Sequence, residues 1–555
     1  MNIYFDTEDN SPELLRAGKS GFGKRVTQIC AVTDGDEWFL DASPRKFLAW
    51  LSLYRSCKPV VWAHNLQYDL GNLFADELDK LNVTMVGGRL IRAEWGPITF
   101  QDSYNLWPMN LKSIGAAFGL EKGQMDVRSE AYVRRDVEIL RAAIQHVGAF
   151  VAEIGGDRIP ATLGSLTVAA WQHFGGENFH ESSPMSKAGF FGGRVELFRW
   201  GLQTSGMLGG PCERIQHVDV NSLYPFAMMQ RFPACASPID SIECDGVVDA
   251  TVTVPEQPYC PLPVRLEYGR VCYPWGRMRG VWTTVELREA VRAHDAKLVK
   301  IHCGLGDPGK EENAPYRDFM TLCYERRLRA TTEAQKLFWK LLMNNLYGRL
   351  CVSGRISRSV KLSEENKSSG TPYGTKNLLT YNMPLPETTN YLHAAWVTGL
   401  GRVRLLEYMR KIRPEAMIYC DTDSLVYHGT TPGSSKLVGE MKHEGTYETA
   451  CCYVPKGYRF GTTYKAKGVP KAKAREFLEE GKTAFDLPFR MRESIAFFDR
   501  LWEEEPDTMK RKLSVWRTVE KEFSAVYDRK EKRGDGRYHP YTMKHFQARL
   551  VAPEY

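Results

Sequence analysis

Short apolar runs alternate with a longer helical pattern over the first 150 residues of the chain. The runs with strand character lie at residues 3–5, 26–32, 60–63 and 98–100. An amphipathic pattern with a helical period covers residues 132–151. Strands that alternate with helices are typical of an α/β domain, which we predict for residues 1–185.

The rest of the chain mixes strand and helix patterns without this alternation. A polar, glycine-rich stretch at residues 182–193 predicts a boundary, and residues 186–555 predict an α+β region. Two segments rich in turn residues, 237–312 and 351–386, interrupt this region, and we predict that they are insertions.

The composition is that of a folded protein of several domains. Of the 555 residues, 43% are hydrophobic and 25% are charged, which excludes disorder, collagen-like repeats and a small disulfide scaffold. No apolar run approaches the ~20 residues that span a membrane, and the first ten residues lack the features of a signal peptide. The 13 cysteines include no Cys-x-x-Cys pair, so we expect reduced thiols in an intracellular protein.

Basic charge is concentrated toward the C-terminal end. The formal net charge is +7, and residues 456–555 hold 23 Lys and Arg against 16 Asp and Glu. The stretch from Lys456 to Arg475 contains seven basic residues and no acid. Such a stretch suits a phosphate backbone, although a solvated basic surface is the simpler interpretation.

Four carboxylates near the N-terminus are spaced so that they can converge. Asp6 and Glu8 share one face of a strand, Asp69 follows the strand at 60–63, and Asp136 shares a helix face with Tyr132. Four such acids can hold two Mg²⁺ ions that activate a water and stabilise the oxygen leaving a phosphodiester. Taken singly, each acid is more simply a surface charge.

A second group of acids lies in the α+β region. Residues 417–427 read as a strand, a turn containing Asp421 and Asp423, and a second strand. Asp219 ends another apolar strand, and Tyr224 lies five residues further on. Buried acids are costly unless they are paired or bind metal, so a metal centre is one interpretation. An ordinary polar hairpin turn is the other.

Residues 333–347 predict a helix, with Gly348 ending it at the C′ position. At about 100° per residue, four polar side chains form one stripe on this helix. The stripe consists of Lys336, Lys340, Asn344 and Tyr347. Because we expect no acid to pair with its lysines, they can bind a triphosphate while the tyrosine stacks on a base. The alternative is an amphipathic helix with its polar face in solvent.

Six short motifs, in order along the chain, resemble those of family B DNA polymerases. FDTE (5–8), HNLQYD (64–69) and YVRRD (132–136) resemble the three motifs of the family's 3′–5′ proofreading exonuclease. DVNSLYP (219–225), KLLMNNLYG (340–348) and YCDTDS (419–424) resemble its three polymerase motifs. Chance does not explain six motifs in this order.

Further features resemble the protein-primed branch of the family, found in phages and linear plasmids. FFGG (190–193) is similar to the Tyr-x-Gly-Gly link of that branch, and KGY (456–458) is similar to its Lys-x-Tyr motif. The two insertions lie where this branch carries its terminal-protein-interacting regions. Phe190 departs from the tyrosine of the link, and Asn345 stands where the family often has serine.

The resemblance implies an RNase H-like α/β exonuclease domain at residues 1–185 and an α+β right-hand polymerase domain at 186–555. The implied parts of the polymerase domain are a palm (186–236 and 387–480), a first insertion that contacts terminal protein and DNA (237–312), fingers (313–350), a second insertion (351–386) and a thumb (481–555).

The resemblance also implies roles for single residues of the polymerase. Asp219, Val220 and Asp423 would hold the catalytic metals, with support from Asp421, and Tyr224 would stack under the sugar and exclude a 2′-hydroxyl. The residues implied to bind the incoming nucleotide are Val220, Tyr224, Lys336, Lys340, Asn344 and Tyr347. Those implied to contact template or primer DNA are Thr398, Arg402, Lys456 and Tyr458.

In the exonuclease, the resemblance implies that Asp6, Glu8, Asp69 and Asp136 are metal ligands and that Tyr132 positions the attacking water. Asn65 and Ser103 would hold the frayed primer end. The catalytic lysine of that family is assigned to Lys122.

The implied function is template-directed DNA synthesis with 3′–5′ proofreading, with two Mg²⁺ or Mn²⁺ ions in each site. The expected partners are template–primer DNA, dNTPs and a terminal protein that primes replication of a viral or linear plasmid genome. We expect a monomer that binds no membrane, in the host cytoplasm or a mitochondrion. The alternatives are a family B polymerase that uses a nucleic-acid primer or starts unaided, and a nuclease or DNA-binding replication factor with an inactive polymerase site.

Overall fold

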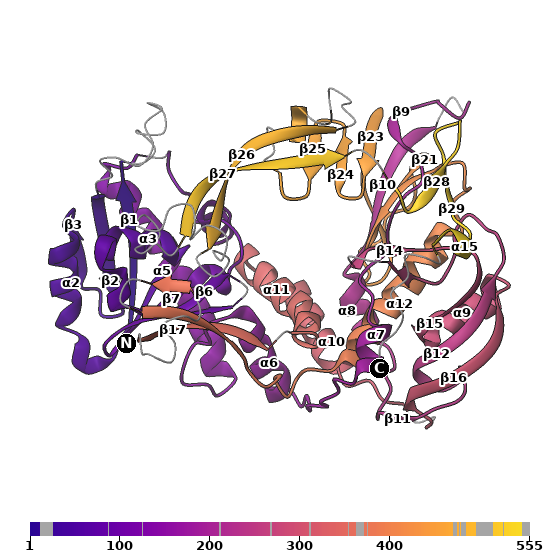
Figure 1. Ribbon diagram of the computed structural model, residues 1–555. Helices are drawn as coiled ribbons and strands as arrows, with labels where there is room; N and C mark the ends of the chain where they lie inside the picture. The colour runs from indigo at the N-terminus through magenta and orange to yellow at the C-terminus, as the bar shows by residue number, and fades with distance from the viewer. Residues whose placement is uncertain are drawn as a thin grey trace.

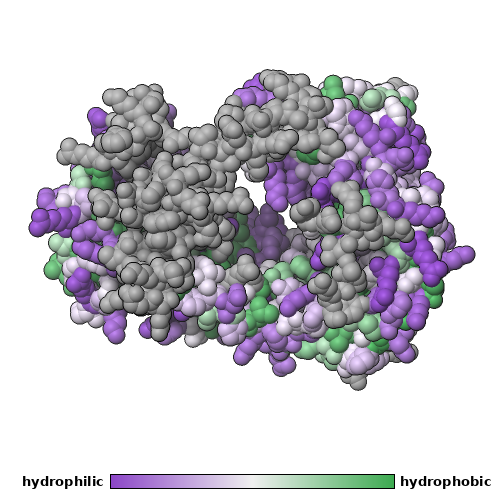
Figure 2. Space-filling view, in the orientation of Figure 1, coloured by the Kyte–Doolittle hydropathy of each residue, from purple (hydrophilic) through white to green (hydrophobic). Residues whose placement is uncertain are grey.

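The computed structural model forms two bodies that lie side by side around an open centre (Figure 1). The hairpin of β26 (Ala484–Ser494) and β27 (Ser514–Ser524) reaches across the top from one body toward the other. The space-filling view shows the molecule hollowed at its centre, with hydrophilic residues beside the hollow (Figure 2). The structure describes residues 1–10, 26–86, 88–124, 126–209, 213–266, 269–309, 312–352, 354–361, 371–373, 376–469, 474–476, 478, 484–494, 514–524 and 527–546.

The N-terminal body is built on a ten-stranded sheet in the order β18-β19-β17-β5-β6-β7-β4-β1-β2-β3. Strand β1 lies parallel to β4 and antiparallel to β2. The first seven strands are β1 (Asn2–Asp9), β2 (Val26–Thr33), β3 (Trp38–Asp41), β4 (Val60–Ala63), β5 (Asn82–Val86), β6 (Arg89–Trp95) and β7 (Ile98–Asp102).

The alternation of β1 decides what lies on each face of this sheet. Ile3 and Phe5 point to the face covered by α2 (Pro44–Ser52) and α3 (Leu66–Phe74). Tyr4 points to the opposite face, where it packs with residues of α5 (Glu130–Glu153). Asp6 and Glu8 follow Tyr4 at even positions, so both acids face α5.

Three strands of this sheet come from the segment predicted to be the second insertion. They are β17 (Arg355–Lys361), β18 (Thr371–Tyr373) and β19 (Lys376–Asn382). Strand β17 pairs with the edge strand β5, with Ser357 opposite Met85. The sheet therefore joins the N-terminal domain to a segment far away in the sequence.

The second body is centred on a five-stranded sheet in the order β22-β10-β21-β20-β8, here called the central sheet. Its strands are β8 (Val195–Leu197), β10 (Arg214–Val220), β20 (Met417–Asp421), β21 (Ser424–Gly429) and β22 (Met441–Tyr447). Residues of α8 (Leu223–Met228) and α12 (Tyr391–Met409) form a common core with it.

Helices α10 (Arg317–Arg329) and α11 (Glu333–Arg349) lie between the two bodies. Phe338 and Trp339 of α11 form edge-on contacts with Phe150 of α5. A capping box of Thr332 and Gln335 fixes the start of α11. Gly348 lies inside the helix, because α11 continues to Arg349 and Leu350 is its C-cap. The prediction that Gly348 ends the helix is therefore wrong: its φ is not positive, as a C′ glycine requires.

Residues 237–307 form a separate four-stranded sheet in the order β11-β16-β12-β15, with α9 (Thr284–Ala293) packed on it. A smaller sheet, in the order β25-β24-β23-β9, lies beside the central sheet. The strands of these two sheets are β9 (Gly201–Thr204), β11 (Ser237–Pro238), β12 (Asp245–Val254), β15 (Gly276–Thr283), β16 (Lys297–Asp307), β23 (Thr449–Val454), β24 (Gly457–Phe460) and β25 (Thr463–Ala466).

Residues 527–546, here called the strap, follow the β26–β27 hairpin. Backbone hydrogen bonds join them to the second body. The predicted thumb at 481–555 includes both the hairpin and the strap. The strap contains β28 (Lys530–Lys532), β29 (Tyr538–Pro540) and α15 (Met543–Phe546). The other short elements are η1 (Arg55–Cys57), η2 (Ala75–Lys80), η3 (Ser103–Asn105), α4 (Leu111–Ala117), α6 (Leu163–His173), α7 (Pro184–Gly189), β13 (Val264–Arg265) and β14 (Val271–Cys272).

Two further predictions concern membranes and cysteines. Within the described ranges, no helix combines the length and the apolar character needed to cross a membrane. The cysteines in those ranges are all free thiols, as the sequence predicts.

Candidate active sites

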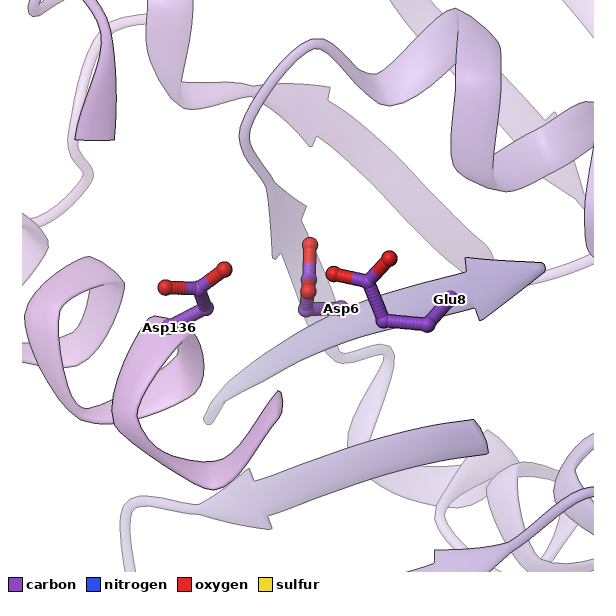
Figure 3. A group of neighbouring side chains, drawn as sticks. All are labelled: Asp6, Glu8 and Asp136. Carbon is purple, nitrogen blue, oxygen red and sulfur yellow. The ribbon is translucent and has the colours of Figure 1, made fainter. Parts of the chain in front are cut away.

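Three carboxylates of the N-terminal body converge on one point. Asp6 and Glu8 project from β1, and Asp136 projects from α5 (Figure 3). One oxygen of each lies within 4.8 Å of the others, and all three side chains are buried. Strand alternation and helix geometry thus bring these three acids together as the spacing predicts.

Asp69, the fourth predicted acid, lies on α3 and binds β1. Its Oδ1 accepts hydrogen bonds from the Thr7 backbone N–H at 3.0 Å and from Thr7 Oγ1 at 2.7 Å. Its Oδ2 is buried and has no hydrogen-bond partner among the described residues. Asp69 is therefore next to the group of three, and its charge raises the pKa of Asp6.

Lys122 provides a cation at these acids. It forms an ion pair with Asp136 Oδ2, and its Nζ lies 4.7 Å from the centroid of the Tyr132 ring. Lys122 is the residue that the resemblance assigns as the lysine of the exonuclease. Its position beside Asp136 and Tyr132 fits that assignment.

Burial and mutual repulsion raise the pKa values of the acids. Burial raises the pKa of Glu8 to about 7, and the charge of Asp136 adds to the shift. Burial and the neighbouring acids hold the pKa of Asp6 well above its usual range, while Lys122 opposes this shift. Carboxylate oxygens are the ligands that Mg²⁺ and Mn²⁺ prefer. Two of them, Asp69 Oδ2 and Asp136 Oδ1, are buried without a hydrogen-bond partner in the described part of the chain, so this donor set fits a divalent cation.

The two residues predicted to hold a primer end lie beside this group in different settings. Asn65 has a left-handed backbone with φ of 68°, and its N–H donates to Asp102 Oδ1 at 2.8 Å. Ser103 is buried, and its hydroxyl lies 2.8 Å from His64 Nδ1. The structure therefore engages the Ser103 hydroxyl inside the protein rather than presenting it on a surface.

Asp219 lies on β10 of the central sheet, and Asp423 lies in the turn between β20 and the neighbouring strand β21. Asp219 pairs with Ser424 across β10 and β21, and the Val220 N–H donates to the Asp423 carbonyl at 2.7 Å. Burial raises the pKa of Asp219 to about 7, and the charge of Asp423 adds to the shift. Two acids that repel each other in this way are a donor set that a divalent cation would stabilise. Val220 is fully buried, so only its main chain can take part.

Residues 421–423, here called the acid turn, have a strained backbone. Thr422 has φ of 62°, and the Asp423 N–H donates to the Asp421 carbonyl at 2.7 Å. Lys456 Nζ binds Asp421 Oδ1 at 2.6 Å, and the Lys456 N–H donates to Tyr419 Oη at 2.8 Å. Strain of this kind collects at functional sites. The predicted Lys-x-Tyr motif therefore supports the acid turn directly.

Tyr458, the second residue of that motif predicted to bind DNA, lies on β24 in a group of aromatic rings. Its ring centroid is 4.3 Å from that of Phe460 and 5.6 Å from that of Tyr419. Lys465 lies over the ring with Nζ 5.7 Å from its centroid.

One part of the polar stripe on α11, at Lys340, lies near Asp219 of the central sheet. Lys340 and Asn344 are exposed, and the charge of Lys340 lowers the pKa of Asp219 against the effect of burial. The Tyr224 and Tyr347 ring centroids lie 4.6 Å apart. Lys340 and the rings of Tyr224 and Tyr347 thus lie near the acids of the central sheet.

One expectation about this stripe is wrong. Lys336 Nζ binds Glu333 Oε1 at 2.6 Å, so an acid does pair with one of the lysines. Glu333 is three residues before Lys336 and lies on the same face of the helix. Both side chains are well exposed, so solvent weakens the pair.

Thr398 and Arg402, predicted to contact DNA, are both buried in α12. Arg402 Nε binds Glu286 at 2.8 Å, and its Nη1 donates to the carbonyls of Phe191 and Gly192 at 2.8 and 2.7 Å. The Thr398 hydroxyl donates within its own helix. The structure does not present either side chain to DNA, because α12 is enclosed by residues of the first insertion and of the FFGG segment.

Sequence reasoning overlooked Glu444. It lies on β22 beside β10, its charge raises the pKa of Asp219, and Lys442 Nζ binds its Oε1 at 2.6 Å. The register between β10 and β22 shifts at His217 and Val218, and such bulges redirect side chains near active sites. The alternation of Lys442 and Glu444 is the sequence signal that marks them as neighbours on one strand face.

Comparison with known proteins agrees with this geometry. Residues 121–382 match the family model described as DNA polymerase type B, organellar and viral. The chain is 23% identical over 418 residues to the DNA-directed DNA polymerase of Enterobacteria phage PRD1, which covers 70% of each chain. It is 23% identical over 358 residues to the primer-independent DNA polymerase PolB of Escherichia coli, which covers 55% of this chain and 38% of that protein.

The fold is also that of a solved polymerase. Phi29 DNA polymerase complexed with primer-template DNA superposes with a TM-score of 0.67 at 17% identity, over 95% of this chain and 100% of the other. The chain is therefore similar, in sequence and in fold, to the type B DNA polymerases of organelles and viruses. The resemblance to the protein-primed branch of family B is thereby confirmed, and the chain is a DNA-directed DNA polymerase.

Proposed function

We propose that the chain copies DNA at the acid turn and proofreads at the acid group of the N-terminal body, in protein-primed replication of a viral or linear plasmid genome. The observation that carries the proposal is the meeting of Asp219 on β10 with Asp423 in the turn before β21, with the charge of Lys340 of α11 acting on Asp219.

For synthesis, Asp219, Asp423 and the main chain of Val220 hold two Mg²⁺ or Mn²⁺ ions. When bound, these ions lower the pKa of a primer 3′-hydroxyl and neutralise charge on the leaving pyrophosphate. Asp421 keeps its place through Lys456 and leaves the other two acids to the cations.

The nucleotide-binding residues act on the incoming dNTP without covalent chemistry. Lys336 and Lys340 lie one turn apart and bind the triphosphate. Their positive charges stabilise the negative charge that develops on the leaving pyrophosphate. Tyr224 lies against Tyr347 and closes the space beside the sugar, so a 2′-hydroxyl is excluded. Asn344 and Tyr347 shape the pocket for the new base pair.

For proofreading, Asp6, Glu8, Asp69 and Asp136 hold the cations that assist hydrolysis of the primer end. Tyr132 orients the attacking water, and Lys122 holds Tyr132 and Asp136 in position. Asn65 steadies the frayed strand next to the acids. The attacking oxygen thus comes from water in the N-terminal body and from the primer 3′-hydroxyl in the second body.

The proposed partners are template–primer DNA, dNTPs and a terminal protein. The first insertion, residues 237–312, forms its own sheet beside the central sheet and offers a surface for the terminal protein. We place the DNA in the hollow at the centre of the molecule, which hydrophilic residues border (Figure 2). A second candidate is synthesis that starts unaided, which the similarity to the primer-independent polymerase of Escherichia coli favours.

The decisive experiment is primer extension on a singly primed circular template with Mg²⁺ and dNTPs. We expect long products from the wild type and none from Asp423→Asn, while Asp6→Asn extends the primer and fails to degrade single strands. A wild type that only degrades primers at every dNTP concentration contradicts the proposal. A second reaction without primer, with and without the genome's terminal protein, separates priming by protein from unaided starts.

A further inference from the structure

The strap connects the first insertion to the central sheet. Its Tyr538 N–H donates to the Phe198 carbonyl at 2.9 Å, and the Trp200 N–H donates to the Gly536 carbonyl at 3.1 Å. At its other end, the Met543 N–H donates to the Trp275 carbonyl at 2.7 Å. The strap therefore pairs with the chain next to β8 and with the first insertion at the same time.

Both ends of the strap are buried in existing cores. Tyr527 and Tyr538 pack with Tyr419 in the core below the central sheet. Met543 and Phe546 pack with Trp282 in the core of the first insertion. Removing large buried side chains from two cores at once would be costly, so the strap is an integral part of the second body.

A buried ion cluster lies where the strap crosses β8. Lys530 Nζ binds Glu196 Oε1 at 2.9 Å, and Arg194 forms an ion pair with Glu196 Oε2. The three side chains are only 1–2% exposed. Arg194 Nη1 also donates to the Cys260 carbonyl of the first insertion at 3.0 Å. Glu196 connects all three segments, because each of the two buried cations has an anionic partner, in the described part of the chain, only while Glu196 lies between them.

This cluster is one hydrogen bond away from the acid turn. The Thr422 N–H donates to the Arg194 carbonyl at 2.7 Å. Strand β8 pairs with β20 so that Glu196 is opposite Cys420 and Val195 is opposite Asp421. At Gly193, an added Cβ would lie 2.6 Å from Thr422 Cγ2, so the segment before Arg194 touches the turn closely. The route from Lys530 to Thr422 contains only Glu196 and Arg194.

We propose that Lys530 is a positioning residue of the polymerase site, through which the strap holds Arg194 and thereby the acid turn. The proposal rests on the proposed function of Asp219 and Asp423. It explains why a lysine is buried in β28. It also means that the first insertion and the acid turn share one anchor, since Arg194 binds both Cys260 and Thr422.

The test compares Lys530→Met with Lys532→Met. Lys532 is on the same strand and makes the same change of charge, but its Nζ lies over the Trp200 ring at 3.7 Å and it is exposed. For Lys530→Met we expect kcat of single-nucleotide incorporation to fall about 10-fold or more, because small displacements of reacting groups are costly. The KM for dNTP, the Kd for primer–template and the unfolding temperature should stay close to wild type, because Lys530 touches neither nucleotide nor DNA and leaves Arg194 paired with Glu196. Lys532→Met should match wild type in every measurement.

A Lys530→Met enzyme with kcat within twofold of wild type overturns the proposal, as does one whose KM rises while kcat is unchanged. If the variant fails to fold, Glu196→Gln with and without Lys530→Met decides. Glu196→Gln leaves two cations facing each other, so adding Lys530→Met should restore folding and part of kcat. No restoration overturns the proposal. A wild type that makes no product refutes instead the proposed function itself.

Discussion

The two acid centres use similar side chains in different surroundings. In the N-terminal body, Asp6, Glu8 and Asp136 are all buried, and Lys122 forms an ion pair with Asp136. At the central sheet, Asp219 and Asp423 are half-buried, and their neighbouring cations, Lys456 and Lys340, lie on separate elements.

The difference shows that the two centres obtain their cations in different ways. The closed group takes its lysine from its own body. The open group takes its cations from α11 and from the turn before β24, so it is complete only when those segments are in place. The first centre takes its acids and its lysine from the N-terminal body alone, whereas the second combines elements that are far apart in the sequence.

The largest expected effect separates the two centres outright. Asp423→Asn keeps the size of the side chain and removes its charge, so DNA synthesis should fall by about 1,000-fold or more. Degradation of single-stranded DNA should remain within twofold of wild type. Steady-state assays of both reactions on one preparation check this. Loss of both activities together would show that the centres are not independent.

The next largest effect is expected at Tyr224, the residue proposed to exclude ribonucleotides. Tyr224→Ala should reduce the preference for dNTPs over rNTPs by about 100-fold, because space for a 2′-hydroxyl opens beside Tyr347. Single-nucleotide kcat/KM for dCTP and CTP measures the ratio. If Tyr224→Ala incorporates ribonucleotides no better than wild type, the gate assignment is wrong. Tyr224→Phe keeps the ring and serves as the control.

Substitution of Lys122, the lysine beside the acids of the N-terminal body, should have a smaller effect. Lys122→Met should slow the exonuclease by about 10- to 100-fold. Lys122 lowers the pKa values of Asp6, Glu8 and Asp136, so its removal raises them. The acid limb of the exonuclease pH–rate profile should therefore move to higher pH, while the profile of DNA synthesis stays unchanged. A shift to lower pH would contradict the geometry.

The smallest effect is on stability. The pKa of Asp219 is raised to about 7, so its favourable contribution is present below its usual pKa near 4 and is lost as pH rises through about 7. In metal-free buffer, Asp219→Asn should stabilise the protein at pH 8 by about 1 to 2 kcal/mol, allowing for solvent, and by little at pH 5. Urea unfolding at the two pH values measures this. Equal stability at pH 8 would show that Asp219 is not strained by its neighbours.

Sequence spacing predicts the local part of the acid groups. Alternation along β1 places Asp6 and Glu8 on one face, and the packing of α5 against β1 brings Asp136 to them. Helix spacing could also have predicted that Glu333 pairs with Lys336, since the two residues lie one turn apart. Four non-glycine residues with positive φ lie within the motifs: Asn65, Ser222, Thr422 and Lys456. A strained backbone of this kind is common at functional sites, where it overrides local sequence preferences.

Long-range pairing was beyond such reasoning. The burial of Arg402 depends on Glu286 and on the carbonyls of Phe191 and Gly192, which no periodicity relates to α12. The cluster of Lys530 with Glu196 likewise joins residues from opposite ends of the polymerase region. These contacts come from tertiary structure, which sequence spacing does not encode directly.

The pairing of β17 with β5 has a consequence for how the chain is made. A ribosome adding about 5 to 20 residues per second completes Met85 roughly 15 to 50 seconds before it reaches Ser357. During that interval the β5 edge of the nascent sheet has no strand beside it. An unpaired edge is a template for association with other chains, so a cell that makes this polymerase must shield that edge until the second half of the protein arrives.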